Sequence, residues 1–464
     1  MVMKYPGGRG GSRIGTRMGR DSWRAVALVA LITALKLNNG YYAPAAMAFL
    51  SLAIVALFLA RQACPRPLSR LGWGVVIAVL SIENVSYAAS FPNSFTPGVV
   101  AVVFGGVLAI MPVRARVRSL ALGVAAVGMV ELTTAHWRWG FSRIDVFYIL
   151  QRGATQLLHG RNPYLARYTA GTGLHFTYGP ATAILAAPAA WLGDARVMNL
   201  ICFAAIVVAV GLLARRGGAS GATWSGVVAT TIVVPTTPLL ITAAWTEVYP
   251  LAAICWWLVV RSRHRTIGIA LLAIALAAKF TVLPAIVVLA LWSVSLRREI
   301  LWAAAASLAV YIPFAIWTGP ASFVYDVAGV FGHLNNDVGS LSLNGAAQAI
   351  LHATVPFFLS GAAGLLVLSW VVLHKPRDAA DLLDAAALVS LVGFFLAKWA
   401  FFNYYIIPVV LLLVGFAFGR GLFGPPPDWL LPDPRRCWLG HTSVGRGQAA
   451  RLSVRRRDSA EASG

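Results

Sequence analysis

One carboxylate stands alone among cations in residues 142–164. Asp145 is the only acid of this stretch, which also contains Arg143, Arg152 and Arg161. A guanidinium binds phosphate oxygens through two parallel hydrogen bonds and stays charged where water is scarce. A carboxylate beside such a phosphate can take the proton of an incoming hydroxyl while the phosphate leaves. The stretch therefore has the residue types needed to transfer a group from a phosphate to a hydroxyl, without a metal.

A plainer interpretation of the same carboxylate is a helix cap. Ser142 with Asp145 three residues later resembles a capping box, which stabilises a helix by about 1 kcal/mol and does no chemistry. Apolar residues recur at helical spacing over 146–158, with polar residues between them, so the sequence predicts an amphipathic helix at the membrane surface. Gly160 and Pro163 end it. On spacing alone the cap explains the carboxylate slightly better than catalysis.

The composition places this helix in a membrane protein. The chain is 59% hydrophobic and 12% charged, with a mean hydropathy of +0.74, whereas soluble domains have roughly 25% charged residues. Apolar runs long enough to cross a bilayer core of about 30 Å recur from Ala25 to Phe418. We therefore predict an all-α polytopic bundle of about 12–14 transmembrane helices, with the amphipathic helix and its loop on the outer side.

The formal charge of +22 indicates membrane topology rather than nucleic-acid binding, because the cations lie at the ends of apolar runs. The tail arginines, Arg20 and Arg24 among them, are expected to be solvated. The four cysteines fit neither a disulfide framework nor a metal site, and we expect no cofactor. The predicted parts are a basic cytoplasmic tail (1–24), a four-helix membrane extension (25–118), a membrane catalytic domain (119–418) and a second basic cytoplasmic tail (419–464).

Threading the chain between its basic clusters puts both termini in the cytoplasm and the polar interruption 136–180 outside. The run 266–296 would measure about 46 Å as one helix. That is too long for one span, so we predict a break that places Lys279 at the outer surface. Ionisable groups in apolar segments are costly and usually functional. Those expected on the outer side include Glu83, Glu131, Asp194, Glu247, Asp326, Asp337, His159, His175, Lys398 and Asn403.

Two strings of the outer loop carry a family resemblance. "DVFYILQRGATQLLHGRNPY" and "HFTYGPATAILAAPAAWLG" resemble the first outer loop of the GT-C membrane glycosyltransferases, most of all glycosyltransferase family 87. That family contains bacterial polyprenol-phosphate-mannose-dependent mannosyltransferases. Its members pair an Asp and a following Tyr with a G-x-P-Y element and a later Y-x-P, and here Asp145, Tyr148, "GRNPY" and "YGP" stand in that order. The resemblance, over roughly 119–418, implies an inverting, metal-independent hexosyltransferase with Asp145 as general base.

The resemblance also implies further site residues. "LAAKFTVLPAIVVLAL" looks like the family's lysine-bearing hairpin and "FFNYYIIPVVLLL" like the start of its final aromatic helix. Where relatives often carry Gly-Gln-Asn this chain has "WTEVYP", which makes Glu247 a second acid to test, and four extra helices precede the expected first one. The candidates for binding phosphate or sugar are Arg143, Tyr148, Arg152, Arg161, Tyr164, Tyr178, Glu247, Lys279, His333 and Tyr404.

Three functions remain open at this point. The first is transfer of a hexose, with mannose favoured, from a polyprenyl phosphate to an extracytoplasmic glycolipid or polysaccharide at the plasma membrane. The second is a transporter or lipid flippase, which should show paired repeats and ionisable groups near the bilayer midplane; here these groups gather at one rim. The third is an inactive scaffold in envelope assembly, which would need Asp145 only as a cap.

Overall fold

The structure is a computed structural model that describes residues 18–89, 97–138, 145–166, 168, 175–329 and 339–418. These ranges contain 19 α-helices and no strand. In lipid each backbone N–H and C=O must find its partner inside the protein, and a helix satisfies them within one segment. The predicted all-α membrane fold is confirmed.

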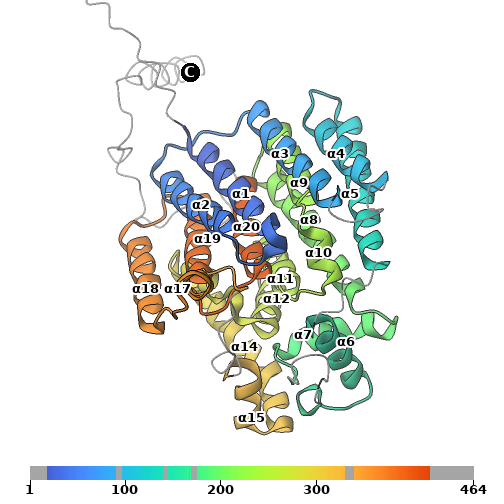
Figure 1. The fold of residues 1–464 in the computed structure, drawn as a ribbon, viewed down its shortest axis with the longest axis vertical. Coiled ribbons are helices and arrows are strands. Elements are labelled where there is room, and N and C mark those ends of the chain that lie inside the picture. The colour runs from blue at the N-terminus through green and yellow to red at the C-terminus, as the bar shows by residue number, and fades with distance from the viewer. Residues whose placement is uncertain are drawn as a thin grey trace, which may run out of the picture.

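The first five helices follow the predicted apolar runs. They are α1 (Arg20–Lys36), α2 (Pro44–Gln62), α3 (Arg70–Ala89), α4 (Pro97–Ile110) and α5 (Ala115–Arg138). α1 pairs with α2, and α4 pairs with α5. α3, α4 and α5 pack on α9 (Gly221–Ile232), and α1 packs on α20 (Phe402–Ala417). The extension predicted over 25–118 thus lies directly against the rest of the bundle (Figure 1); its status as a separate domain stays a prediction.

The remaining helices continue the bundle and close one end of it. They are α6 (Asp145–Leu158), α7 (Pro180–Trp191), α8 (Arg196–Arg216), α10 (Thr237–Thr242), α11 (Val248–Val260), α12 (Arg265–Ala278), α13 (Leu283–Ala290), α14 (Val294–Thr318), α15 (Pro320–Val324), α17 (Leu343–Leu351), α18 (Phe357–Leu373) and α19 (Ala379–Leu396). Short 3-10 turns cover Pro163–Leu165 and Phe280–Val282, and a π-helical turn covers Tyr325–Gly329. Figure 1 shows α6, α7 and α15 together at the lower end of the molecule, here named the α6 end.

Five described helices are long and apolar enough to cross a membrane alone. They are Pro44–Gln62, Ala115–Ala135, Arg196–Arg216, Val294–Thr318 and Ala379–Leu396, and the bent pair Arg265–Ala278 with Phe280–Ala290 makes a sixth if it is one span. Four shorter apolar helices accompany them: Pro97–Ile110, Val248–Val260, Phe358–Leu373 and Phe402–Ala417. A helix of 16 residues reaches only about 24 Å. The predicted 12–14 crossings therefore depend on short helices shielded by their neighbours, and that number stays a prediction.

The predicted break at Lys279 is confirmed, but the lysine lies elsewhere than expected. α12 ends at Ala278, Lys279 is extended (φ −159°, ψ 133°), and the chain bends by 113° into the next helical segment. Lys279 is only 5% exposed. It is buried rather than at the surface because a carboxylate inside the bundle pairs with it, which removes the cost of burying a lone cation.

Arg20 and Arg24 are also buried rather than solvated, since α1 begins earlier than predicted. Both join a group of ion pairs here named the α19 cluster: Asp378, Asp381 and Asp384 with Arg20, Arg24, Arg61 and Arg377. The shortest contacts are Arg24 Nη2 to Asp384 Oδ2 at 2.6 Å, Arg20 Nη1 to Asp378 Oδ2 at 2.7 Å and Arg61 Nε to Asp381 Oδ1 at 2.9 Å. The carboxylates on α19 lie about one turn apart, and they draw the arginines of α1 and α2 inward.

Candidate active site

The amphipathic helix predicted over 146–158 is present as α6, with its apolar side inward. Val146, Ile149, Leu150, Gly153 and Ala154 are buried. The helix packs on α7, and a Cβ added at Gly153 would lie 2.5 Å from the ring of Phe176. Only a glycine lets that ring approach so closely, so the loop before α7 holds α6 in place.

A second set of contacts fixes α6 along its length. Gln151 Oε1 accepts a hydrogen bond from the backbone N–H of Ala195 at 2.6 Å. The guanidinium of Arg196 stacks 4.5 Å from the ring centre of Phe147 and forms an ion pair with Asp194 at 2.6 Å. These contacts are made by Phe147, about half a turn after Asp145, and by Gln151, nearly two turns after it. They therefore hold the start of α6, where Asp145 lies.

The "YGP" motif docks against the end of α12. Gly179 N–H donates to the carbonyl of Ala278 at 3.0 Å, and the hydroxyl of Thr182 donates to the same oxygen at 2.8 Å. A Cβ at Gly179 would lie 2.1 Å from the carbonyl oxygen of Ala277, so no other residue fits here without a backbone shift. Pro180 starts α7 at the position where a proline is best tolerated. The motif therefore places Tyr178 beside the break at Lys279.

Tyr164, from the "GRNPY" element, holds the same loop through a hydrogen bond to its backbone. The phenol donates to the carbonyl of Tyr178 at 2.6 Å, and the ring packs edge-on against Phe176 and Phe323. Tyr164 is fully buried. Its hydroxyl thus holds the loop that carries Tyr178.

Four polar side chains from three separate segments meet next to this loop; we name them the Lys279 cluster. Lys279 Nζ lies 2.5 Å from Glu247 Oε1 and donates to Thr246 Oγ1 at 3.0 Å. Asn403 Nδ2 donates to the same Glu247 oxygen at 2.7 Å. Thr246, Glu247 and Asn403 have no exposed surface. Glu247 and Lys279 are 32 positions apart, and Asn403 comes 156 positions after Glu247, so only the fold brings them together.

The turn that delivers Glu247 has an unusual backbone. Ala244 adopts φ +58°, a left-handed conformation that side chains other than glycine seldom take. It lies between α10 and α11, and the backbone carbonyl of Trp245 accepts a hydrogen bond from Asn199 at 2.8 Å. This turn aims Thr246 and Glu247 into the bundle just before α11 begins.

Two oxygens of the Lys279 cluster have no hydrogen-bond partner among the described residues. These are Glu247 Oε2 and Asn403 Oδ1, both buried. The rings of Tyr178 and Tyr404 flank the ammonium group, with their centres 5.2 Å and 5.1 Å from Lys279 Nζ. Buried acceptors without donors are rare and costly in folded proteins. The cluster therefore offers two acceptors between two aromatic faces to a ligand that carries donors.

The charge of Asp145 influences Tyr178, the tyrosine beside this cluster. Burial raises the pKa of the Tyr178 phenol well above its ordinary value, and the negative charges of Asp145 and Glu247 raise it further. Asp145 Oδ1 accepts the backbone N–H of Val146 at 2.9 Å, so the carboxylate does contact the start of its own helix. Ser142, the other half of the expected capping box, lies outside the described residues.

Residues 176–402 match the model of glycosyltransferase family 87. This region belongs to glycosyltransferase family 87. The protein is accordingly a membrane glycosyltransferase. No curated protein and no solved structure matches the chain. The matched region contains Tyr178, Glu247 and Lys279, begins after Asp145 and ends one residue before Asn403.

Several of the other predicted site residues of this glycosyltransferase lie along α6 or just after it. Asp145, Tyr148 and Arg152 share one side of the helix, since they are three and seven positions apart. Arg161 follows the far end of α6, about 21 Å from its start, so it does not meet Asp145. Arg152 and Arg161 are exposed and Tyr148 is half-buried. The predicted candidates that lie outside the described residues are Arg143 and His333.

Two members of the Lys279 cluster were not predicted as site residues of the glycosyltransferase. Asn403 stood among the outer polar groups without a role, and Thr246 was not singled out. When a Glu and a Lys each interrupt an apolar segment, the sequence indicates that the two side chains pair with each other. No spacing rule points to Thr246 or Asn403, because their contacts arise only when α11, α12 and α20 pack.

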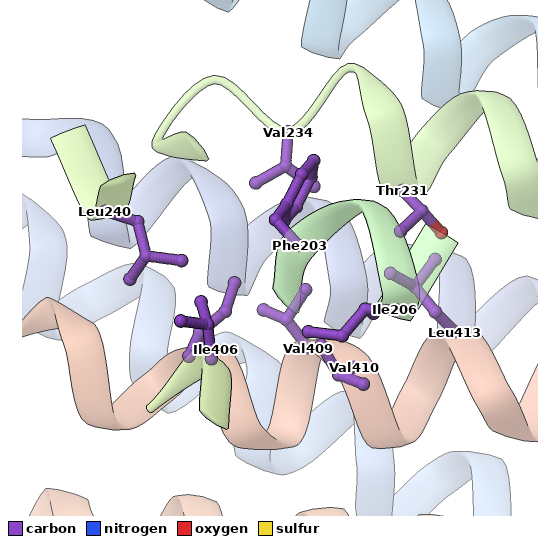
Figure 2. A pocket seen from close by; sticks show the side chains of 10 residues that line it. Phe203, Ile206, Thr231, Val234, Leu240, Ile406, Val409, Val410 and Leu413 are labelled. Carbon is purple, nitrogen blue, oxygen red and sulfur yellow. The ribbon is translucent and has the colours of Figure 1, made fainter. Parts of the chain in front are cut away.

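Two further features of the glycosyltransferase lie outside this cluster. Figure 2 shows an apolar gap beside α20, lined by Phe203, Ile206, Thr231, Val234, Leu240, Val248, Ile406, Val409, Val410 and Leu413. Its one hydroxyl, on Thr231, donates to the carbonyl of Val227 at 2.8 Å, so the gap has no group left for chemistry. In the described part of the chain no three His, Cys, Asp or Glu side chains gather as metal ligands; transfer without a metal stays a prediction.

Proposed function

We propose that this glycosyltransferase moves a hexose from a polyprenyl phosphate to a lipid or polysaccharide acceptor, with mannose as the favoured sugar. One observation carries the proposal: α6, which begins at Asp145, packs on α7, and the loop before α7 places the ring of Tyr178 5.2 Å from Lys279 Nζ of the buried cluster. In this proposal the proton acceptor on α6 and the polar groups of the Lys279 cluster act on one bound donor. That combination suits a reaction in which a hydroxyl is deprotonated beside a bound sugar.

The reaction is a single displacement at the anomeric carbon. The acceptor oxygen forms its bond to that carbon as the bond from carbon to phosphate oxygen breaks. The phosphate leaves with the electron pair as prenyl phosphate, and Asp145 takes the proton of the acceptor hydroxyl. Attack from the side opposite the phosphate inverts the configuration at the anomeric carbon.

The leaving phosphate requires positive charge, and α6 carries it. Arg152 is exposed on the same side of α6 as Asp145, two turns further along, so a lipid phosphate lying along this face reaches both. A guanidinium keeps its charge and binds phosphate through a planar pair of hydrogen bonds. This arrangement needs no metal ion to neutralise the leaving group.

The same proposal fixes an orientation in the membrane. The α6 end faces the extracytoplasmic side of the plasma membrane, and the α19 cluster and both termini face the cytoplasm. The basic residues flanking the apolar runs support this orientation. A polyprenyl phosphate donor would then approach from the outer leaflet.

The test is sugar transfer from radiolabelled polyprenyl-phosphate mannose in membranes that contain matched amounts of protein. Asp145→Asn keeps the size and the capping ability of the side chain and loses the base. We expect transfer to fall by about 10²–10⁴-fold. The matched control is Asp378→Asn, since Asp378 also caps a helix, accepting the N–H of Asp381 at 2.8 Å; it should transfer like the wild type.

Each other outcome is informative. Equal transfer by wild type and Asp145→Asn would show that Asp145 is only a helix-end residue, and Glu247 would be the next acid to test. Absence of transfer by the wild type would exclude this donor. A loss in both variants would point to helix stability rather than to base catalysis.

A further inference from the structure

We infer that the Lys279 cluster binds the uncharged hydroxyl groups of the transferred sugar ring rather than the phosphate of the donor. This rests on the proposed function, because it divides the lipid-phosphate sugar between two subsites. The sugar ring would lie against Glu247 and Asn403, between the rings of Tyr178 and Tyr404. The phosphate would lie towards α6.

The charge of the cluster argues against a phosphate. Lys279 is already paired with Glu247 at 2.5 Å, and both side chains are almost wholly buried. The pair has no net charge to offer an anion. A phosphate at Lys279 would stand next to the buried carboxylate of Glu247, and like charges repel strongly where water is excluded.

The open hydrogen-bonding positions of the cluster are acceptors. Glu247 Oε2 and Asn403 Oδ1 are buried and, among the described residues, receive no hydrogen bond. An ionised phosphate has only acceptors and cannot satisfy them. Sugar hydroxyls are donors, and a carboxylate beside a carboxamide matches two neighbouring hydroxyls of one ring. The two oxygens belong to side chains already joined by the 2.7 Å bond from Asn403 Nδ2 to Glu247 Oε1, so they act as one unit.

The aromatic walls fit the same ligand. The rings of Tyr178 and Tyr404 both lie about 5 Å from Lys279 Nζ, and the C–H faces of a sugar ring are apolar enough to pack on them. Tyr404 is half-buried whereas the polar members are fully buried, so the ring of Tyr404 forms the open edge of the site. A few fixed polar groups among apolar walls are typical of small-ligand sites.

Asn84 provides a comparison within the same chain. It is as buried as Asn403, donates its amide to the carbonyl of Val233 at 2.6 Å, and also has an unpartnered Oδ1. Its amide nitrogen also donates to the carbonyl of Leu80 at 2.9 Å. Asn84 is therefore a matched control for the loss of a buried amide.

The experiment compares two ligands on the purified full chain in lipid nanodiscs: a short-chain prenyl phosphate, and the same prenyl phosphate carrying mannose. Dissociation constants are measured by thermal stabilisation. We expect wild type to bind the mannose-bearing lipid at least about 10-fold more tightly. Asn403→Leu should bring this ratio down to about 1–3 without weakening the bare prenyl phosphate, whereas Asn84→Leu should keep the wild-type ratio.

A second variant covers the case in which Asn403→Leu does not fold. Lys279→Met combined with Glu247→Gln removes both charges at similar volume, a change that buried ion pairs often tolerate. It should also lose the preference for the mannose-bearing lipid and keep the affinity for the bare lipid.

Four results would overturn the inference. If a variant weakens both lipids equally, the cluster holds the phosphate. If both variants keep the wild-type ratio, the sugar binds elsewhere. If wild type binds both lipids equally, the donor class of the proposed function survives while the sugar subsite does not. If wild type binds neither lipid, the proposed donor is wrong and the subsite assignment falls with it.

Discussion

The two buried ionic groups of this glycosyltransferase differ in how completely their oxygens are used. In the α19 cluster Asp384 receives Arg24 on both oxygens, at 2.7 and 2.6 Å, and Asp381 receives Arg61 on one and the N–H of Arg377 on the other, both at 2.9 Å. In the Lys279 cluster one oxygen of Glu247 receives two donors and the other receives none from the described residues. The carboxylate oxygens of Asp381 and Asp384 all receive donors, although Arg20 Nε, Arg61 Nη1 and Arg377 Nη2 are buried without a partner among the described residues. The Lys279 cluster differs in that a carboxylate oxygen itself lacks a donor.

The two clusters also differ in the cation that each one uses. The α19 cluster uses arginine, whose planar fork fills both oxygens of a carboxylate at once. The Lys279 cluster uses lysine, a compact charge on a flexible stem that contacts one oxygen and leaves the other open. A buried salt bridge is weak evidence for function on its own; its unfilled acceptors distinguish the site from the structural contact.

The largest effect on stability is expected at the α19 cluster. Asp384→Asn leaves Arg24 buried without its main counter-charge, which should lower the free energy of unfolding by about 3–5 kcal/mol. Denaturation of the purified protein in detergent measures this, followed by the two-ligand binding test. The ratio between mannose-bearing and bare lipid should stay unchanged in whatever protein remains folded.

A neutral replacement of the same pair sharpens this result. Arg24→Met with Asp384→Leu removes both charges together, and most of the lost stability should return, because no buried charge is left unpaired. If the single variant is as stable as wild type, the α19 cluster is not the structural contact described here. If either variant changes the lipid ratio, the separation between the two ionic groups fails.

An intermediate effect is expected at Gly179, which positions Tyr178 beside the Lys279 cluster. Gly179→Ala places a Cβ 2.1 Å from the carbonyl oxygen of Ala277, and relieving such an overlap costs about 1–3 kcal/mol. Because Gly179 holds Tyr178 beside Lys279, sugar transfer should fall more than stability does. Transfer assays and thermal unfolding measure the two. The matched control is Gly364→Ala on α18, where the new methyl meets nothing within 4 Å.

The smallest effect concerns a third acid, Asp326, which lies 3.5 Å from His175 at the α6 end. Burial raises the pKa of Asp326 above its ordinary value of 3.8, and His175 partly opposes the rise. The folded state then holds the proton more tightly than the unfolded chain, so stability is lost as the pH rises through the window just above 3.8. Asp326→Asn should flatten the dependence of the unfolding temperature on pH just above pH 3.8. A steeper slope in the variant would contradict this.

The sequence predicted the elements better than the contacts between them. Helical spacing predicted α6, and the excess length of 266–296 predicted the break at Lys279, because both are local properties. The depth of Lys279 was predicted wrongly, since its partner Glu247 approaches only when α11 and α12 pack. The same reason hid Asn403, which reaches the cluster from α20. Arg24 was assigned to a solvated tail because nothing near it in the sequence reveals Asp384.

The pairing of α1 with α19 has a consequence for synthesis. Arg24 and Asp384 are 360 positions apart, and at 5–20 residues per second a ribosome takes about 20–70 s to travel that far. During this interval α1 and α2 are already made, while Arg24 has only Asp21 of its own helix as a partner and Arg61 still lacks Asp381. The newly inserted helices must keep these side chains at the lipid surface or shielded by the insertion machinery. These ion pairs can form only when α19 arrives, so the synthesis of α19 is the step that lets α1 and α2 reach their native contacts.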